Sequence, residues 1–325
     1  MLPSSSLIRC YFVLCTLLPA VRSWAQIDVS NSPRVPAGIA NSATADTTQT
    51  FWFWYENDLF AGTDRYYTQG VYTQVSHPAF RHLDIGGILT PGRTDKYAYS
   101  LRASLEAYTP SSIRSDSILR GDHPYAGLFY LSALSQSLNA GSRWWTGASL
   151  SLGLIGPVAG GEEIQTRIHR ATDNFIPLGW QHQIRNDILL NYHYELGYRL
   201  SHSQGHLVSA FSKAYVGTLL DQACVGFSSD VYPLPMLKQF SLRLHTGVEG
   251  QVVAYDTKLQ GGLFNRTSPY VISSNELSRL RAKGMVSITL SYRRVFIGAN
   301  YSWRSREFST GQGHKWGGVY TGFDF

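Results

Sequence analysis

The sequence predicts an all-β protein, an antiparallel transmembrane β-barrel of about twelve strands with one short helical insert. Apolar and polar residues alternate over segments longer than the five or six residues that are typical of a soluble strand. A tilted strand that crosses the outer membrane needs about nine to eleven residues. Charged residues make up only 15% of the chain, whereas soluble domains carry about 25%. The 20 tyrosines and 8 tryptophans match the aromatic girdles of such barrels.

The alternation is clearest in residues 188–200, where Ile188, Leu190 and Tyr192 share one face with later apolar residues. Glu195 and Arg199 lie on the opposite face, which must be the lumen because lipid cannot solvate charges. Segments of this kind predict twelve strands, an even number as in single-chain barrels. The predicted strands are 50–57, 67–76, 96–108, 125–138, 143–155, 187–201, 206–219, 221–232, 239–255, 279–293, 294–307 and 315–325. The tryptophans Trp52, Trp54, Trp144 and Trp145 are expected in the girdles or against lipid.

The N-terminus has the features of a secretory signal peptide. Arg9 precedes an apolar stretch, Cys10–Ala20, and Ser23–Ala25 forms a small-x-small cleavage site. The apolar stretch is too short to span a membrane as a helix. We therefore expect a signal peptide over residues 1–25, a flexible lead-in over 26–48 and a barrel domain over 49–325. Export would place the barrel in the bacterial outer membrane.

Removal of the signal peptide would leave Cys224 as the only cysteine, so the mature chain has no intrachain disulfide. The formal net charge is +6, but no basic run exceeds the pair Arg293–Arg294. Dispersed basic residues on strands fit lipopolysaccharide phosphates at least as well as nucleic acid, and no nucleic-acid partner is expected.

Polar side chains gather where the first predicted strand ends. Glu56, Asn57 and Asp58 follow an aromatic strand, and a second polar stretch, 63–70, opens the next strand. The carboxylate and amide oxygens suit a hard cation. An Asn-Asp pair is also common in turns for local reasons, since Asx side chains bond their own backbone. The residues alone leave both interpretations open.

Several motifs, taken together and in order, resemble the LpxR family of lipid A deacylases. The resemblance spans almost the whole mature chain. The residues that carry it are Glu56–Asp58, Thr63–Gly70, Gly121–Gly127, Ile155–Pro157, Gly160–Arg170, Pro177, Gly179–Gln181, Gln183 and Glu307–Gly311.

The resemblance implies a twelve-stranded outer-membrane barrel that acts on lipid A or lipopolysaccharide. The implied activity is a Ca²⁺-dependent ester hydrolysis that removes the 3′-linked acyloxyacyl chain. The family's essential Asn-Asp pair falls on Asn57 and Asp58, its essential Thr on Thr68 and its essential His on His169. A substrate-binding Lys of the family has Arg114 or Ser115 in its place here.

The resemblance also suggests roles for residues near the site. Asp173 is the nearest candidate for the family's acidic residue after the histidine, so Asp58, Thr68 and Asp173 are the predicted metal ligands. Tyr66 and Tyr67 are expected either on acyl chains of the substrate or at the membrane interface.

Ester hydrolysis needs an activated water and a stabilised oxyanion. We predict that His169, on a helical insert over Gly161–Ala171, is the general base, with Glu163 or Gln165 orienting its ring. A calcium ion would act as a Lewis acid on the ester carbonyl.

Two alternatives remain open: a non-catalytic porin, and a serine-type outer-membrane phospholipase. The phospholipase needs a serine positioned by a histidine, and the stretch 202–206 lacks the His-x-Ser-Asn-Gly arrangement of that family. A monomer is expected, because a closed barrel has no free edge to pair.

Overall fold

The computed structural model describes residues 49–63, 65–90, 97–137, 142–203, 205–233 and 240–325. The predicted signal peptide, 1–25, and the whole lead-in, 26–48, lie outside the described residues.

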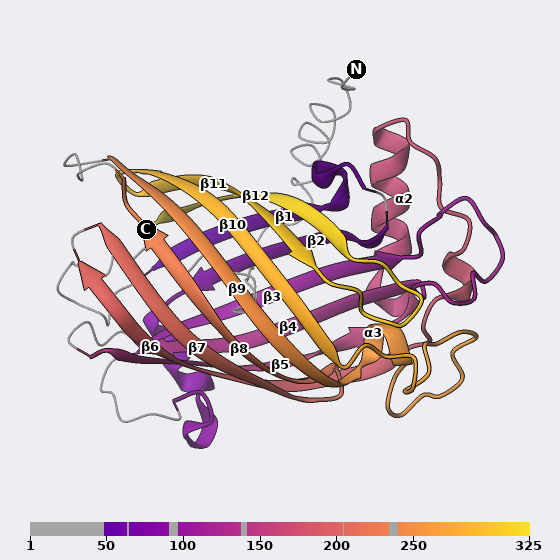
Figure 1. Ribbon diagram of the computed structural model, residues 1–325, viewed down its shortest axis with the longest axis horizontal. Helices are drawn as coiled ribbons and strands as arrows, with labels where there is room; N and C mark the ends of the chain where they lie inside the picture. The colour runs from indigo at the N-terminus through magenta and orange to yellow at the C-terminus, as the bar shows by residue number, and fades with distance from the viewer. Residues whose placement is uncertain (1–48, 64, 91–96, 138–141, 204, 234–239) are drawn as a thin grey trace.

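Twelve antiparallel strands close into one barrel, in which β1 pairs with both β2 and β12 (Figure 1). The predicted fold class is therefore confirmed. The strands are β1 Thr50–Asn57, β2 Tyr66–Ser76, β3 Tyr97–Thr109, β4 Ala126–Ser137, β5 Trp144–Ile155, β6 Asp187–Ser203, β7 His206–Gly217, β8 Leu220–Val231, β9 Phe240–Asp256, β10 Leu280–Tyr292, β11 Val295–Arg304 and β12 His314–Asp324.

The two faces of the wall differ in polarity, as the alternation predicted. Outward residues such as Val225 and Leu152 are apolar and exposed, by 67% and 60%. On the lumen side, Lys213 and Glu249 form a buried ion pair, with 2.8 Å between Nζ and Oε2. An apolar exterior around a charged interior is the arrangement of a barrel in lipid. Among the described residues, no helix is long and apolar enough to span a membrane.

The expected positions of three tryptophans were wrong. Trp52 and Trp54 have the same parity along β1 as Glu56, so their side chains enter the lumen, where they are almost fully buried. They pack there against three other aromatic residues, Tyr72, Phe296 and Tyr320. Trp144 is outward and 55% exposed, as expected, but its neighbour Trp145 is buried. A period of two sends alternate residues of one strand to opposite faces, so an aromatic run cannot form a girdle as a whole.

The connections at the two ends of the barrel differ in length. The loop end carries the long connections 110–125, 156–186, 257–279 and 305–313, together with the β1–β2 connection. The opposite end, which we call the turn end, has mostly short connections, and 77–96 between β2 and β3 is its longest. The loop end holds α2 (Gly161–Ala171), α3 (Thr257–Gln260) and the short 3-10 helices η3 (Asp58–Ala61), η6 (Pro157–Ala159) and η7 (Trp180–His182). The helical insert has the predicted bounds.

Helix α2 stands beside the barrel wall and not inside the lumen (Figure 1). It contacts β3 and β4. The contact is close because glycines face each other: a Cβ on Gly127 of β4 would lie 3.1 Å from the Gly161 nitrogen. Ala107 on the outward side of β3 packs with Tyr125 and with Trp180, which follows α2 in the chain. The helix therefore covers part of the outer surface of the wall near the loop end.

Candidate active site

Asn57 links β1 to the 3-10 helix η3. Its side-chain Oδ1 accepts a hydrogen bond from the Leu59 backbone nitrogen at 2.7 Å, which makes it the N-cap. Its Nδ2 donates to the Tyr55 hydroxyl at 3.1 Å. These contacts fix the amide oxygen at the rim of the wall, as a cap does, while leaving that oxygen a second lone pair.

Asp58 is buried within the same connection, at 2% exposure. Its Oδ2 accepts a hydrogen bond from the Arg65 backbone nitrogen at 2.6 Å, and its backbone carbonyl accepts one from the Thr63 nitrogen at 3.2 Å. The carboxylate therefore closes the loop between β1 and β2. Turn chemistry, one of the two interpretations of the Asn-Asp pair, is thus part of its role.

A bulge in β2 turns Thr68 away from its neighbour Tyr67. The pairing with β3 shifts between Tyr67 and Gln69, so Thr68 has no partner across the ladder. Tyr67 borders the lumen cavity, whereas the hydroxyl of Thr68 accepts a hydrogen bond from Gln165 Nε2 of α2 at 3.2 Å. Two adjacent residues of one strand thus serve opposite sides of the wall.

Gln165 holds the outer side of this wall together. Its Oε1 accepts a hydrogen bond from the Trp180 indole nitrogen at 2.7 Å, and its Nε2 donates to Thr68. The two bonds fix which end of the amide faces the strand. Gln165 is 1% exposed, so this clamp is also shielded from solvent.

His169 lies one helical turn after Gln165 on the same face of α2, because residues four apart are neighbours on a helix. Its Nδ1 lies 2.5 Å from the backbone carbonyl of Phe175. A carbonyl only accepts, so Nδ1 is the donor in this bond, and Nε2 is the nitrogen that remains to accept a proton when the ring is neutral. His169 is buried, at 8% exposure, so the bond to Phe175 fixes the orientation of its ring.

The expected partners of the His169 ring were wrong. Glu163 forms an exposed ion pair with Arg167, with 2.5 Å between oxygen and nitrogen, and Gln165 is committed to Thr68 and Trp180. The Phe175 carbonyl orients the ring instead. The sequence carries no side-chain signal for a backbone partner of this kind.

The structure brings most of the predicted catalytic residues to one rim. Asn57 pairs with Gln69, the neighbour of Thr68, across β1 and β2. Thr68 in turn contacts Gln165, 97 positions later in the chain. The hairpin and the helical insert therefore converge.

Two predicted residues lie in the loops around α2. The Arg114 guanidinium lies over the Phe175 ring, 4.9 Å from its centroid, and the side chain is exposed. The backbone carbonyl of Phe175 bonds His169, so Phe175 contacts both Arg114 and His169. Asp173 is exposed in the turn after α2, with a backbone φ of 57°. The side chains of Gln165 and Trp180 also belong to this region; the sequence marked Trp180 only as part of a motif and assigned Gln165 a different partner, the His169 ring.

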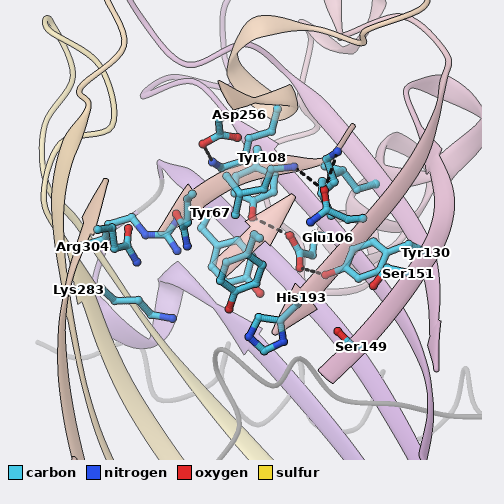
Figure 2. Close-up of a pocket in the computed structure, with 18 of the residues that line it drawn as sticks. Tyr67, Glu106, Tyr108, Tyr130, Ser149, Ser151, His193, Asp256, Lys283 and Arg304 are labelled. Carbon is cyan, nitrogen blue, oxygen red and sulfur yellow. Dashed lines mark hydrogen bonds and ion pairs between the residues drawn. The ribbon is translucent and has the colours of Figure 1, made fainter. Parts of the chain in front are cut away.

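Tyr67 has a structural environment on the lumen side (Figure 2). Its hydroxyl donates to Glu56 Oε2 at 2.9 Å and lies 2.5 Å from the Tyr72 hydroxyl. Tyr72 continues the chain to Glu106, which also accepts from Tyr130 at 2.7 Å. These groups border a cavity of about 120 Å³. Its position places Tyr67 across the wall from Thr68, so contact with acyl chains at the outer surface is not supported.

An ion cluster lies beneath the loops that cover the lumen. Glu307, from the β11–β12 loop, binds Lys258 at 2.9 Å and Arg281 and Arg304 at 3.0 Å each. Burial by itself would raise the pKa of Glu307, but these three cations hold that pKa well below its usual range. The cluster fastens the loop to α3, β10 and β11.

The oxygens at the rim are of the chemical types that bind a hard cation. Asp58 offers one carboxylate, and Asn57 and Thr68 offer an amide and a hydroxyl oxygen, each already accepting one hydrogen bond. Within the described parts of the chain, no three His, Cys, Asp or Glu side chains gather as a metal site. A cation here would thus need neutral and backbone oxygens as well, which Ca²⁺ accepts.

Comparison with known proteins identifies the family. A sequence model described as "Outer membrane protein LpxR" matches residues 12–325. The chain belongs to the LpxR family. The fold of "LpxR from Salmonella typhimurium" superposes with a TM-score of 0.70 at 20% identity, over 85% of this chain and all of that one.

Other solved barrels resemble this LpxR-family chain less. The β domain of the Bordetella autotransporter BrkA has a TM-score of 0.47 at 7% identity, over 86% of this chain and all of that one. The KdgM porin has a TM-score of 0.40 at 8% identity, over 85% of this chain and 99% of that one. A search among curated protein sequences gave no match. As an outer-membrane protein of this family, the chain has its long loops outside the cell and its short turns in the periplasm.

Proposed function

We propose that this protein is an outer-membrane esterase that removes the 3′-linked acyloxyacyl chain from lipid A, with His169 as the general base. The observation that carries the proposal is the position of the open Nε2 of His169 on the helix that packs outside the wall, near the extracellular end. Lipid A occupies the outer leaflet, so a site on the outer wall meets it without passage through the lumen.

The proposed reaction begins with a water molecule bound at Nε2 of His169. The imidazole takes one proton as the oxygen attacks the ester carbonyl, and the Phe175 carbonyl stabilises the resulting imidazolium through Nδ1. The protonated ring then returns the proton to the leaving alkoxide of the sugar. The products are a free acyloxyacyl acid and a lipid A with a 3′-hydroxyl in its place.

In the proposed scheme, Thr68 stabilises the oxyanion. Its oxygen already accepts a hydrogen bond from Gln165, so its hydroxyl hydrogen is available to donate to a negatively charged oxygen. Gln165 is a positioning residue in this scheme, because it orients the Thr68 hydroxyl and is itself held by Trp180.

We also propose a Ca²⁺ requirement, with Asp58, Asn57, Thr68 and Asp173 as candidate ligands. When bound, the ion would supply Lewis-acid stabilisation of the oxyanion. Turnover should fall when a chelator is added and return with excess Ca²⁺, and full turnover in excess EDTA would refute the requirement. Arg114, exposed beside Phe175, is the proposed contact for a lipid A phosphate.

The deciding experiment is mass spectrometry of lipid A incubated with the purified protein. We expect loss of one acyloxyacyl unit, and a decrease of about 10²- to 10⁴-fold in the rate for His169→Ala. His206→Ala, on an exposed histidine at the turn end, is the matched control and should keep the wild-type rate. Loss of chains from phospholipid would instead support the phospholipase, and no change in either lipid would support a non-catalytic barrel.

A further inference from the structure

The connection 77–96 departs from the short turns expected at the periplasmic end. Its described part, 77–90, contains two 3-10 helices, η4 (Pro78–Leu83) and η5 (Ile85–Gly87). They form the purple turns that project at the lower left of Figure 1. A segment of this length needs a physical explanation, because a two-residue hairpin such as the one at Arg293–Arg294 would join the strands.

The segment is folded by its own hydrogen bonds. Asp84 Oδ1 accepts from the Leu89 nitrogen at 2.6 Å, and Oδ2 accepts from the Thr90 hydroxyl at 2.6 Å. Gly86 and Gly87 both have positive φ, 69° and 75°, which turns the chain back so that Asp84 reaches these donors. The result is a compact element and not an open loop.

This element docks on the outer surface of the wall. Ser149 of β5 and His193 of β6 line the lumen cavity, so Tyr192, the neighbour of His193, faces outward. The Tyr192 hydroxyl donates to the Ile88 carbonyl at 2.9 Å. Tyr130 of β4 also faces the lumen, and the outward Ser135 on that strand donates its hydroxyl to the Leu89 carbonyl.

The docked element buries the part of the wall that it covers. Ser135 is 2% exposed and Leu89 is 1% exposed, although other outward positions of β4, such as Leu131, are 55% exposed. At the start of the segment, the His77 nitrogen donates to the Tyr99 carbonyl of β3 at 3.1 Å, and η4 packs along β3. The element thus crosses the outer face of the wall from β3 to β6. Two of its backbone carbonyls receive hydroxyl donors there, as a polar backbone beside lipid requires.

The opposite side of the element carries an apolar face. Ile85 is 81% exposed, and Leu83 and Ile88 are 40% and 41% exposed. Arg81 and His82 are exposed beside them. Apolar side chains flanked by cations, on an element continuous with a lipid-facing wall, match an interfacial anchor at the boundary of headgroups and acyl chains.

We propose that residues 78–90 anchor the barrel in the periplasmic phospholipid leaflet, with Leu83, Ile85 and Ile88 inserted among acyl chains. Lipid, and not protein, would then cover the remaining apolar surface of this element. The anchor is independent of the esterase site at the other end of the barrel, so the two proposals can fail separately.

Spin labels at single cysteines test the insertion. The variant Ile85→Cys is made in a Cys224→Ser background and reconstituted into vesicles of phosphatidylethanolamine and phosphatidylglycerol. Collision of the label with oxygen, which concentrates in lipid, is compared with collision with a water-soluble nickel complex. Val225→Cys, on the lipid-facing wall, and Ser309→Cys, in an exposed extracellular loop, supply the lipid and water references.

We expect the label at residue 85 to read like the Val225 reference, with oxygen collisions exceeding nickel collisions. A reading like the Ser309 reference would overturn the anchor. The docking is tested by adding Tyr192→Phe and Ser135→Ala, which should make the label at residue 85 more mobile, whereas Tyr194→Phe, on the same strand face, should not. Unchanged mobility in the double variant would overturn the docking. The heat-dependent shift of folded barrels on SDS gels verifies that every variant is folded.

Discussion

The two sides of the wall at the start of β2 differ in how completely their polar groups are used. On the lumen side, Tyr67 is bonded to Glu56 and Tyr72 in a continuous chain that reaches Glu106. On the outer side, the neighbouring Thr68 accepts one hydrogen bond, and His169 is held through its Nδ1. A network whose polar groups are all hydrogen-bonded stabilises a fold. A group that is held in place but keeps an unused donor or lone pair can take part in a reaction. The comparison supports the proposed position of the chemistry, on the outer side of the barrel wall.

Substituting the two neighbours separately is the sharpest way to break this comparison. Thr68→Val removes the hydroxyl on the outer side and should lower the deacylation rate by about 10²- to 10³-fold, as loss of an oxyanion donor does. Tyr67→Phe should leave the rate within a few-fold but lower stability by about 1 to 2 kcal/mol, because a buried carboxylate loses a donor. The rate is followed by mass spectrometry of lipid A, and stability by denaturation of the barrel in detergent. Equal losses of rate in both variants would show that the wall does not separate the two roles.

Acid should weaken the loops over the lumen, and the responsible group can be named. His123, in the extracellular loop 110–125, lies flat on the Tyr108 ring and bonds the Pro124 carbonyl through Nδ1 at 2.6 Å. Burial, with Lys258 nearby, lowers its pKa from 6.5 to about 4, although Glu307 and Asp256 act in the opposite direction. A lowered pKa means that the unfolded chain binds the proton first.

The stability that His123 contributes is therefore complete above pH 6.5 and is lost as the pH falls from 6.5 toward 4. The difference corresponds to about 3 kcal/mol. The unfolding temperature in detergent, measured across this range, should fall for the wild type and fall less for His123→Phe, which keeps the stacking on Tyr108 and removes the titrating group. A decline of the same size in both proteins would assign the pH effect to other groups.

The contact between α2 and the wall provides a graded test of positioning. A Cβ added at Gly161 would lie 2.9 Å from the Gly127 Cα, so Gly161→Ala must shift the helix. We expect about a tenfold lower rate, since a small displacement of His169 and Gln165 costs activity, with little change in the pH dependence of the rate. Glu162→Ala, on an exposed residue of the same helix, controls for helix content. A wild-type rate in Gly161→Ala would show that the spacing between α2 and the wall does not matter.

The sequence predicted the strands and the insert well because each depends on a local pattern. β1 and α2 have the predicted bounds, and other strands differ by a few residues at most. Alternation with a period of two is visible within a single segment, and its register also decides which residues face the lumen. Trp52 and Trp54 were misplaced because an aromatic run suggests a girdle. Their positions along β1 have the same parity as Glu56, which places their side chains in the lumen.

The residues of the candidate site could be named from the motifs, but three features of their arrangement could not be read from the chain. The bulge that turns Thr68 outward depends on the pairing of β2 with β3. The Phe175 carbonyl that orients His169 is a backbone group, and the bond from Trp180 to Gln165 is a tertiary contact. Each arises from packing between segments, for which a single sequence carries no local signal.

The smallest expected effect concerns the exposed face of α2, and it separates two explanations of how His169 is oriented. Glu163 and Arg167 form an ion pair whose side chains are 66% and 59% exposed, and such pairs contribute about 0 to 1 kcal/mol. If the Phe175 carbonyl alone orients the ring, Glu163→Gln should leave both the deacylation rate and its pH profile unchanged, with stability within about 0.5 kcal/mol of the wild type. If the Glu163 carboxylate acts on the imidazole, its loss should shift the acidic limb of the pH profile to lower pH, because a carboxylate favours the protonated ring. An unchanged pH profile would therefore assign the orientation of His169 to the Phe175 carbonyl. The exposed face of α2, which carries Glu163, would then have no part in orienting the ring.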